Sequence, residues 1–178
     1  GEILMKTDYM MTGYYKDPEL TKEVLVDGWL HSGDRGKMDE NGFLKVVGRV
    51  KDAFKTAKGQ FITPNPIEES LMKNECIEQV CVCGINVPQP IALVNLSEAA
   101  SDMDKSKVEA SLQETLTSVN KSLAGYQKVS TLIIDSDQWN EHNEMLTPTL
   151  KVRRGKLDEL YLNAYPGWHE AGAVIVWK

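Results

Sequence analysis

The sequence has no excess of positive charge and no long apolar run. Its formal net charge is −6, with 20 Lys and Arg against 26 Asp and Glu. A general nucleic-acid surface needs an excess of basic side chains to neutralise phosphates, so we expect no nucleic-acid partner. No apolar stretch approaches the roughly 20 residues that cross a bilayer, and no basic and then apolar signal segment opens the chain. We therefore expect a cytoplasmic protein whose contact with membranes is at most peripheral.

Cysteine and histidine are scarce, with three of each. The cysteines, Cys76, Cys81 and Cys83, are odd in number and lack the spacing of a disulfide framework, which favours a reducing compartment. Cys81 and Cys83 alternate with Val80 and Val82, as residues of a strand do. We interpret them as packed thiols, with metal ligation as the alternative, and we expect no metal ligand.

The chain has no internal repeat and no low-complexity tract. Its 178 residues, 42% of them hydrophobic, suffice for one core or for a small domain plus a piece of another. The first residues, Gly-Glu-Ile, lack a methionine, and residues 2–6 already have the pattern of a strand. We expect this start to be a cut inside a longer protein.

Turn signals dominate residues 1–50. Two extended runs within residues 36–48 flank a loop that ends in Asn41-Gly42, which is typical of a hairpin. A second hairpin is expected at residues 53–56 and 60–63, around Lys58-Gly59.

A regular alternation of strands and helices follows. The patterns predict a helix from about Pro66 with Asn65 as its N-cap, and a helix over residues 107–123 with a Ser106/Glu109 capping box. Strands are expected at 79–85, 91–96 and 129–134, and a last helix at 157–164. The tail, residues 165–178, suits an edge strand better than a membrane anchor. We therefore expect an α/β (α+β) domain at residues 51–178 with a mixed sheet and about three helices, after β hairpins in residues 1–50.

Three segments combine residue types suited to nucleotide and acyl chemistry. They are residues 27–34 (Asp-Gly-Trp-Leu-His-Ser-Gly-Asp), residues 48–68 (from Gly48-Arg49-Val50-Lys51 to Pro66-Ile67-Glu68) and residues 144–154 (Glu-Met-Leu-Thr-Pro-Thr-Leu-Lys-Val-Arg-Arg). In this order and spacing they resemble the motifs of the adenylate-forming superfamily, which includes acyl-CoA synthetases, firefly luciferase and peptide-synthetase adenylation domains. The details around Thr56, Pro64 and Thr147 are most similar to the long-chain fatty-acid–CoA ligases.

The resemblance implies ATP-binding roles for Asp34 and Arg49. Asp34 would accept hydrogen bonds from both ribose hydroxyls, a task that suits a carboxylate with its two oxygens. Arg49 would reach ribose and phosphate oxygens with its fork of donors. Taken alone, Asp34 is better explained as a turn aspartate after glycine.

The resemblance also places a hinge at Lys51 and a CoA-binding loop at Lys58 and Gly59. The missing side chain at Gly59 would let the pantetheine arm pass close to backbone. Relatives more often have Gly-Gly or Ser-Gly where this chain has Lys58-Gly59. We interpret Lys55 as a solvated charge of the hairpin, and the same is the alternative for Lys58.

Lys151 corresponds to the catalytic lysine of the closing motif. In the superfamily this lysine contacts the substrate carboxylate and the α-phosphate during adenylation, where a compact ammonium neutralises charge as the two meet. The basic residues that follow, Arg153, Arg154 and Lys156, either meet CoA phosphates or are solvated at a helix start.

The implied function is a carboxylate–CoA ligase that acts on a fatty acid, with Mg²⁺-bound ATP and CoA as co-substrates. The sequence lacks the Ser/Thr/Gly-rich loop ending in Pro-Lys-Gly that grips ATP phosphates in this superfamily. We therefore expect residues 1–50 to be the end of a large nucleotide-binding domain and residues 51–178 to be a mobile C-terminal lid. The rest of the N-terminal domain would be its partner, and this chain alone would be inactive. The alternatives are another adenylate-forming enzyme, whether a medium- or short-chain acyl-CoA synthetase, carrier-protein-loading or luciferase-like, and a non-catalytic interaction module.

Overall fold

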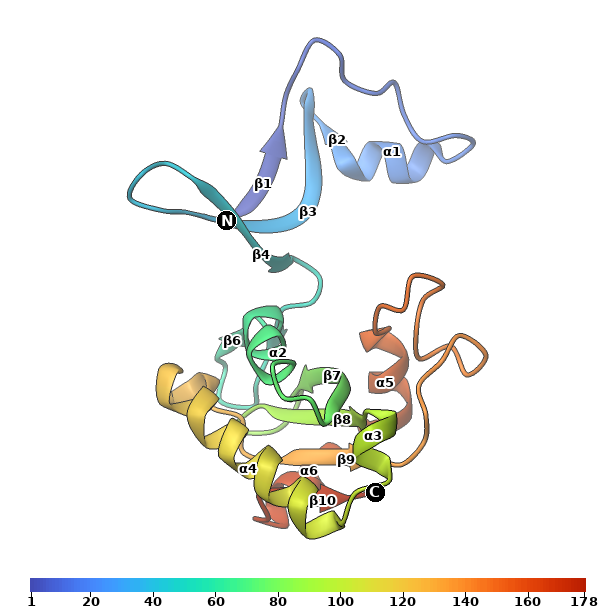
Figure 1. The fold of residues 1–178 in the computed structure, drawn as a ribbon. Helices are drawn as coiled ribbons and strands as arrows, with labels where there is room; N and C mark the ends of the chain where they lie inside the picture. Colours follow the sequence, from blue (N-terminus) through green and yellow to red (C-terminus); the bar gives the residue numbers. More distant parts are fainter. The chain divides into compact units, whose positions relative to one another are not determined.

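The computed structural model describes residues 1–178, which form two compact units, Gly1–Asp52 and Ala53–Lys178. In Figure 1 the first unit runs from blue to cyan and the second from green to red. The two units differ in how they are packed. The first has no buried residue, whereas the second carries the whole apolar core.

The first unit is a small antiparallel sheet built around one long strand, β3 (Trp29–Met38). Strands β1 (Glu2–Met5), β2 (Leu25–Val26) and β4 (Leu44–Arg49) all pair with β3. The turn between β3 and β4 is closed by Asp39, whose carboxylate accepts the N–H groups of Asn41 and Phe43, and Gly42 adopts a left-handed φ of +83°. The hairpin predicted at residues 36–48 is therefore confirmed.

Helix α1 (Pro18–Val24) was not predicted from the sequence. Asp17 caps it by accepting the N–H of Leu20 at 2.9 Å, and Pro18 occupies the first turn. Both signals stand in the sequence, but α1 has no buried residue and therefore no strong apolar period to reveal it.

The second unit contains a mixed four-stranded sheet in the order β10-β9-β8-β7. Strands β8 (Ile91–Leu96), β9 (Leu132–Asp135) and β10 (Ile175–Trp177) are parallel, and β7 (Ile77–Cys83) pairs antiparallel with β8 at the other edge. This confirms the predicted mixed sheet. It also confirms that the tail returns to the sheet as an edge strand.

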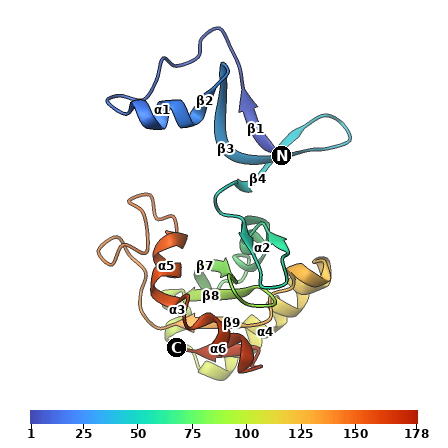
Figure 2. The same cartoon turned by 180° about the vertical axis from the view of Figure 1, so that it is seen from behind.

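Helices cover both faces of this sheet (Figures 1 and 2). The helices are α2 (Asn65–Leu71), α3 (Glu98–Ser101), α4 (Lys105–Ser122), α5 (Arg154–Tyr161) and α6 (Tyr165–Glu170), with a 3₁₀ turn at Gly125–Gln127. A two-stranded hairpin, β5 (Phe54–Lys55) and β6 (Phe61–Ile62), precedes α2 and confirms the second predicted hairpin. None of the helices combines the length and the apolar composition needed to cross a bilayer.

The side chains of the sheet alternate between two separate apolar clusters. The first joins Val82, Val94 and Ile134 of the strands to α2, α4 and the β5–β6 hairpin. The second joins Cys81, Leu93 and Ile133 to α5, α6 and the segment before α5. All three thiols are buried, so their interpretation as packed residues is confirmed. We refer below to the α2/α4 face and the α5/α6 face of the sheet.

Two helix starts differ from the sequence prediction. Helix α2 begins at Asn65 itself with Pro64 as its cap, one residue earlier than expected. Helix α4 begins at Lys105 with Asp104 as its cap, and the predicted Ser106/Glu109 capping box is wrong. The Glu109 carboxylate instead accepts a hydrogen bond at 2.7 Å from the indole N–H of Trp177 in β10. The carboxylate that the capping box needs is therefore bonded to a residue that is distant in the sequence.

A charged network anchors the C-terminal strand. The side chain of Asp135 is fully buried and accepts hydrogen bonds from Trp139 Nε1 at 3.0 Å, the Tyr161 hydroxyl at 3.1 Å and Lys178 Nζ at 2.9 Å. Burial by itself lowers the pKa of Lys178, but its hydrogen bonds to Tyr161, Asp137 and Asp135 outweigh this and raise the pKa above the ordinary lysine value.

We expect Lys178→Met to destabilise the second unit by about 3 kcal/mol, because it leaves the buried Asp135 carboxylate without its cation. A raised lysine pKa stabilises the fold at every pH below the unfolded value, so the loss should be the same from about pH 6 to about pH 9. Urea denaturation of the chain measures it. The control is Lys107→Met, whose ion pair with Asp104 is exposed and should contribute under about 1 kcal/mol. Equal effects of the two substitutions would contradict this account.

Candidate functional site

The register of β3 and β4 brings Asp34 and Arg49 together. These residues are direct cross-strand partners, and Arg49 Nε lies 3.1 Å from Asp34 Oδ1. The Arg49 side chain is 63% exposed and that of Asp34 is 37% exposed, so both can turn to a ligand. The backbone around Asp34 is fixed, because its N–H is bonded to Ser32 Oγ at 3.1 Å and Gly33 adopts a left-handed φ of +73°. An accepting carboxylate beside a donating guanidinium suits a ligand that carries both hydroxyls and an anion.

A hollow of about 630 Å³ lies beside this pair in the first unit. Arg49 and Lys51 line it, together with residues of β1, α1 and β3 and of the segments before α1 and after β4, which are Glu2, Tyr14, Leu20, Glu23, Val24, His31, Ser32, Gly33, Val50 and Asp52. A volume of this size lies within the usual range for small-molecule sites.

Glu2 and His31 belong to this hollow, and sequence reasoning did not single out either for a role. His31 Nδ1 lies 3.0 Å from Glu2 Oε2, and the other carboxylate oxygen accepts the N–H of Gly33 at 3.0 Å. The hydrogen bond from His31 is the main cause that lowers the pKa of Glu2 below its usual value. Glu2 thus braces the backbone next to Asp34. Only the long-range pairing of β1 with β3 reveals this.

Lys51, the predicted hinge residue, is held by an ion pair that is almost fully solvated. Its ammonium lies 3.0 Å from Glu23 Oε1, and the two side chains are 85% and 59% exposed. Exposed pairs of this kind contribute little to stability. The contact therefore adds little resistance to a change of backbone conformation at residues 51–52.

Lys58 and Gly59 form the exposed tip of the β5–β6 hairpin. The turn is closed by the bond from Gly59 N–H to Thr56 O at 2.8 Å and by the bond from Thr56 N–H to Gln60 O at 2.9 Å. Gly59 has a φ of +79°, and a Cβ added there would meet only the end of the Lys55 side chain, at 3.6 Å. The glycine keeps the tip free of side chain at a left-handed position.

Lys151 lies on a tightly hydrogen-bonded loop just before α5. Lys151 O accepts the N–H of Thr147 at 2.8 Å, and Lys151 N–H is bonded to Thr147 Oγ1 at 3.1 Å. Leu150, next to it, adopts a left-handed φ of +58°, an unfavourable conformation for a residue with a large side chain. The Lys151 side chain itself is exposed. A strained, self-bonded loop thus presents one ammonium to solvent.

The hairpin tip and Lys151 do not meet within the second unit. Phe54 and Ile62, at the base of the hairpin, belong to the apolar cluster of the α2/α4 face. Met145 and Leu146, at the base of the Lys151 loop, belong to the cluster of the α5/α6 face. Figure 1 accordingly shows the hairpin beside α2 and the loop before α5 on the other side of the unit. The two predicted elements are rooted in opposite faces of one sheet.

Arg154 fits neither of the two alternatives drawn from the sequence, CoA contact or solvation. Its Nη2 lies 2.6 Å from Glu68 Oε1, and the side chains are only 16% and 14% exposed. Arg153 and Lys156 instead pair at the surface with Glu144, at 3.8 Å and 3.1 Å. The burial of Arg154 is explained by its partner on α2, which is 86 residues away in the sequence.

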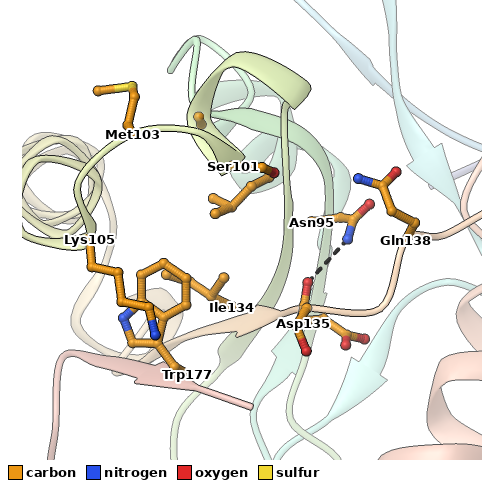
Figure 3. A pocket seen from close by; sticks show the side chains of 11 residues that line it. Asn95, Ser101, Met103, Lys105, Ile134, Asp135, Gln138 and Trp177 are labelled. Carbon is orange, nitrogen blue, oxygen red and sulfur yellow. Dashed lines mark hydrogen bonds between the residues drawn. The ribbon is translucent and has the colours of Figure 1, made fainter.

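A second hollow, of about 290 Å³, lies at the carboxyl ends of the parallel strands β8, β9 and β10 (Figure 3). Lys105 lies over the ring of Trp177 at 4.6 Å on one side, and Asn95 donates a hydrogen bond to the carbonyl of Asp135 on the other. None of the predicted site residues lines it. Its buried polar side chains, Asn95 and Asp135, are already hydrogen-bonded within the protein, and Lys105 and Gln138 are exposed.

The chain is similar to curated proteins named long-chain-fatty-acid–CoA ligases. Ligase 5 of Mus musculus is 33% identical over 190 aligned positions, covering 96% of this chain and 28% of the relative. Ligase 6 of Homo sapiens is 33% identical over 180 positions, covering 90% of this chain and 26% of the relative. The chain thus spans little more than a quarter of the length of these relatives.

The fold is similar to solved adenylation domains. The adenylation domain of a carboxylate reductase from Mycobacterium chelonae superimposes with a TM-score of 0.81 at 26% identity, covering 96% of this chain and 28% of that one. The A domain of a carboxylic acid reductase from Segniliparus rugosus, solved with AMP and a carboxylic acid, gives 0.78 at 26% identity, covering 97% and 28%. Residues 51–164 match the family model described as the AMP-binding enzyme C-terminal domain. The chain therefore belongs to the family of AMP-binding enzyme C-terminal domains, within the adenylate-forming enzymes.

Proposed function

We propose that this chain is the carboxy-terminal part of an ATP-dependent long-chain fatty-acid–CoA ligase. The first half-reaction is attack of a fatty-acid carboxylate oxygen on the α-phosphorus of Mg²⁺-bound ATP, which gives an acyl-adenylate and releases pyrophosphate. In the second, the CoA thiolate attacks the acyl carbon and AMP leaves. The likeness to long-chain ligases over 96% of the chain carries this proposal. The cytoplasmic setting with peripheral membrane contact remains a prediction.

The division of labour between the two units is part of the proposal. Residues 1–50 would be the end of the large nucleotide-binding domain and residues 51–178 the mobile lid. Two observations support this boundary: the compact units divide between Asp52 and Ala53, and the family match begins at residue 51. The first unit has no buried residue and exposes aromatic side chains such as Tyr9 and Phe43, at 94% and 72%, as expected of a piece of a larger domain.

In this reading Asp34 and Arg49 bind the nucleotide. The Asp34 carboxylate accepts the two ribose hydroxyls, while Arg49 remains close enough to share its charge with ribose and phosphate oxygens. The ion pair between them supports the proposal, because it orients the carboxylate before ATP arrives.

The lid would serve the two half-reactions with its two faces. An adenylating ammonium over the α-phosphate and a pantetheine arm at the acyl carbon would compete for one pocket, so the lid must turn between the steps. The separate anchoring of the Lys151 loop and of the Lys58-Gly59 hairpin in opposite faces of the sheet supports this. Lys51, with its solvated ion pair, is the proposed hinge.

Similar solved structures leave one alternative open. The adenylation domains of carboxylate reductases share 26% identity with the chain, so the acyl-adenylate could be delivered to a thiol other than that of CoA. The 33% identity to CoA ligases favours CoA. Thioester formation with CoA, measured on the full-length enzyme, separates the two acceptors. A non-catalytic module would give neither product.

We expect the 178-residue chain alone to release no measurable pyrophosphate from ATP and a fatty acid, while the full-length enzyme does so. Adenylation needs both reactants held in line, and the chain lacks the groups that would grip the triphosphate and the acyl chain. A coupled pyrophosphate assay on both proteins measures this. Turnover by the purified chain would overturn the proposed assignment of parts.

In the full-length enzyme, Lys151→Ala should slow acyl-adenylate formation by about a hundredfold or more, the scale for losing one preorganised charge in a transition state. Carboxylate-dependent pyrophosphate exchange measures this step. Transfer of a supplied acyl-adenylate to CoA should stay close to the wild-type rate. Lys128→Ala, at another exposed lysine of the same unit, is the control and should change neither step. Equal slowing of both steps would make Lys151 a general support of the nucleotide site.

Gly59→Leu should have the opposite effect. We expect it to slow thioester formation from supplied acyl-adenylate by about tenfold or more, which corresponds to at least ~1.4 kcal/mol in the barrier, and to spare pyrophosphate exchange. Part of any effect could come from backbone strain at a left-handed φ. Gly42→Leu controls for this, because Gly42 has a φ of +83° with open space around it. A similar loss in both variants would contradict the CoA-binding role of Gly59.

A further inference from the structure

A largely buried ion pair between Glu68 and Arg154 covers part of a free sheet edge. Strand β7 lies at the edge of its sheet, so backbone groups on its outer side have no strand partner. Glu68 Oε1 accepts the N–H of Val82 at 2.7 Å, and Arg154 Nη1 donates to the carbonyl of the same residue. Together the two side chains occupy both backbone groups of Val82 and bind each other at 2.6 Å. They bridge α2 and α5 across the edge of β7.

Stability alone is a poor explanation for this pair. Desolvation of two charges offsets much of their attraction, and well-packed apolar residues often stabilise a fold equally well. Arg154 is also the first residue of α5, where the positive end of the helix dipole opposes a cation. What the pair provides is geometry, because a guanidinium held by a carboxylate, a carbonyl and the Cys81 sulfur, at 3.1 Å, has one orientation only.

The orientation of Arg154 affects Lys151, which lies three residues before it, because backbone hydrogen bonds connect this segment to residues 145–147. Arg153 N–H is bonded to Met145 O at 2.8 Å, Leu146 and Val152 form an isolated β-bridge, and Lys151 O accepts the N–H of Thr147. The loop that carries Lys151 is therefore anchored at two places. One is the buried pair Met145 and Leu146, and the other is Arg154. The Lys151 side chain makes no hydrogen bond or ion pair of its own, so its place depends on these supports.

We propose that Glu68 and Arg154 are positioning residues that hold the Lys151 loop in place for adenylation. This rests on the proposed function of Lys151. A displacement of about 1 Å caused by a remote substitution can cost about a hundredfold in rate. The β5–β6 hairpin does not need the pair, because Ile67 and Leu71 hold α2 in the core at 1% and 0% exposure. The effect should therefore be confined to the half-reaction that uses Lys151.

The test uses the full-length enzyme with Arg154→Met, Arg154→Lys and Glu68→Gln. Each should lower kcat for pyrophosphate exchange, by about tenfold to a hundredfold, with little change in KM for ATP. Transfer of supplied acyl-adenylate to CoA should remain close to wild type. Arg154→Lys should not rescue, because a single ammonium cannot reproduce the forked contacts. Lys73→Met, an exposed lysine just after α2, is the control and should have no effect.

A double-mutant cycle with Lys151→Ala separates positioning from general support of the fold. If Arg154 acts through Lys151, Arg154→Met in the Lys151→Ala background should slow adenylation no further. If Arg154→Met lowered the adenylation rate by the same factor in both backgrounds, or lowered the rates of both half-reactions equally, the proposal would be overturned. Glu68→Gln keeps an acceptor for Val82 N–H, so the comparison can be made even if Arg154→Met does not fold.

Cys81 gives a readout that does not depend on catalysis. Its thiol is fully buried beneath α5 beside Arg154, and burial raises its pKa, so it should react very slowly with thiol reagents in the wild type. Breaking the ion pair between Glu68 and Arg154 should speed the labelling of Cys81 by dithionitrobenzoate. Mass spectrometry identifies the labelled site. Unchanged labelling in a folded Arg154→Met variant would overturn the proposal. Failure of the proposed function is a separate outcome, in which full-length wild-type enzyme exchanges no pyrophosphate.

Discussion

The mixed sheet of the second unit is the constraint on which the rest of the structure depends. All six residues of β8 are buried, because both faces of this strand pack against helices. Side chains along a strand point alternately to the two faces, so one short run of sequence serves two cores. A segment attached to one core cannot cross to the other without passing the sheet edge.

This constraint explains the distribution of the site. The hairpin with Gly59 is anchored on the α2/α4 face and the loop with Lys151 on the α5/α6 face, so the sheet lies between the two elements. Under the proposed function, the unit would present first one element and then the other by turning as a whole. Glu68 and Arg154 link the two faces at the edge strand β7, where they bind the N–H and the carbonyl of one residue, Val82.

The first unit is held together in a different way. Its residues are placed by β-sheet register alone, without a buried core, and the register of β3 with β4 is what sets Asp34 opposite Arg49. The supporting bonds from Glu2 and Ser32 are also sheet contacts, made across β1 and β3. Backbone pairing can thus hold Asp34 and Arg49 side by side where apolar packing contributes little.

The sequence by itself determined the local elements and the family. Asn41-Gly42 gave the first hairpin, the four-residue apolar period from Val108 gave α4, and the spacing of three motifs gave the family. The tertiary structure decided which side chains bind each other. Glu109 bonds to Trp177 instead of capping α4, and Arg154 is buried against Glu68 instead of being solvated. The physical reason is that a turn or a helix period depends on neighbours in sequence, whereas the burial of a charge depends on which distant segment arrives beside it with the matching charge.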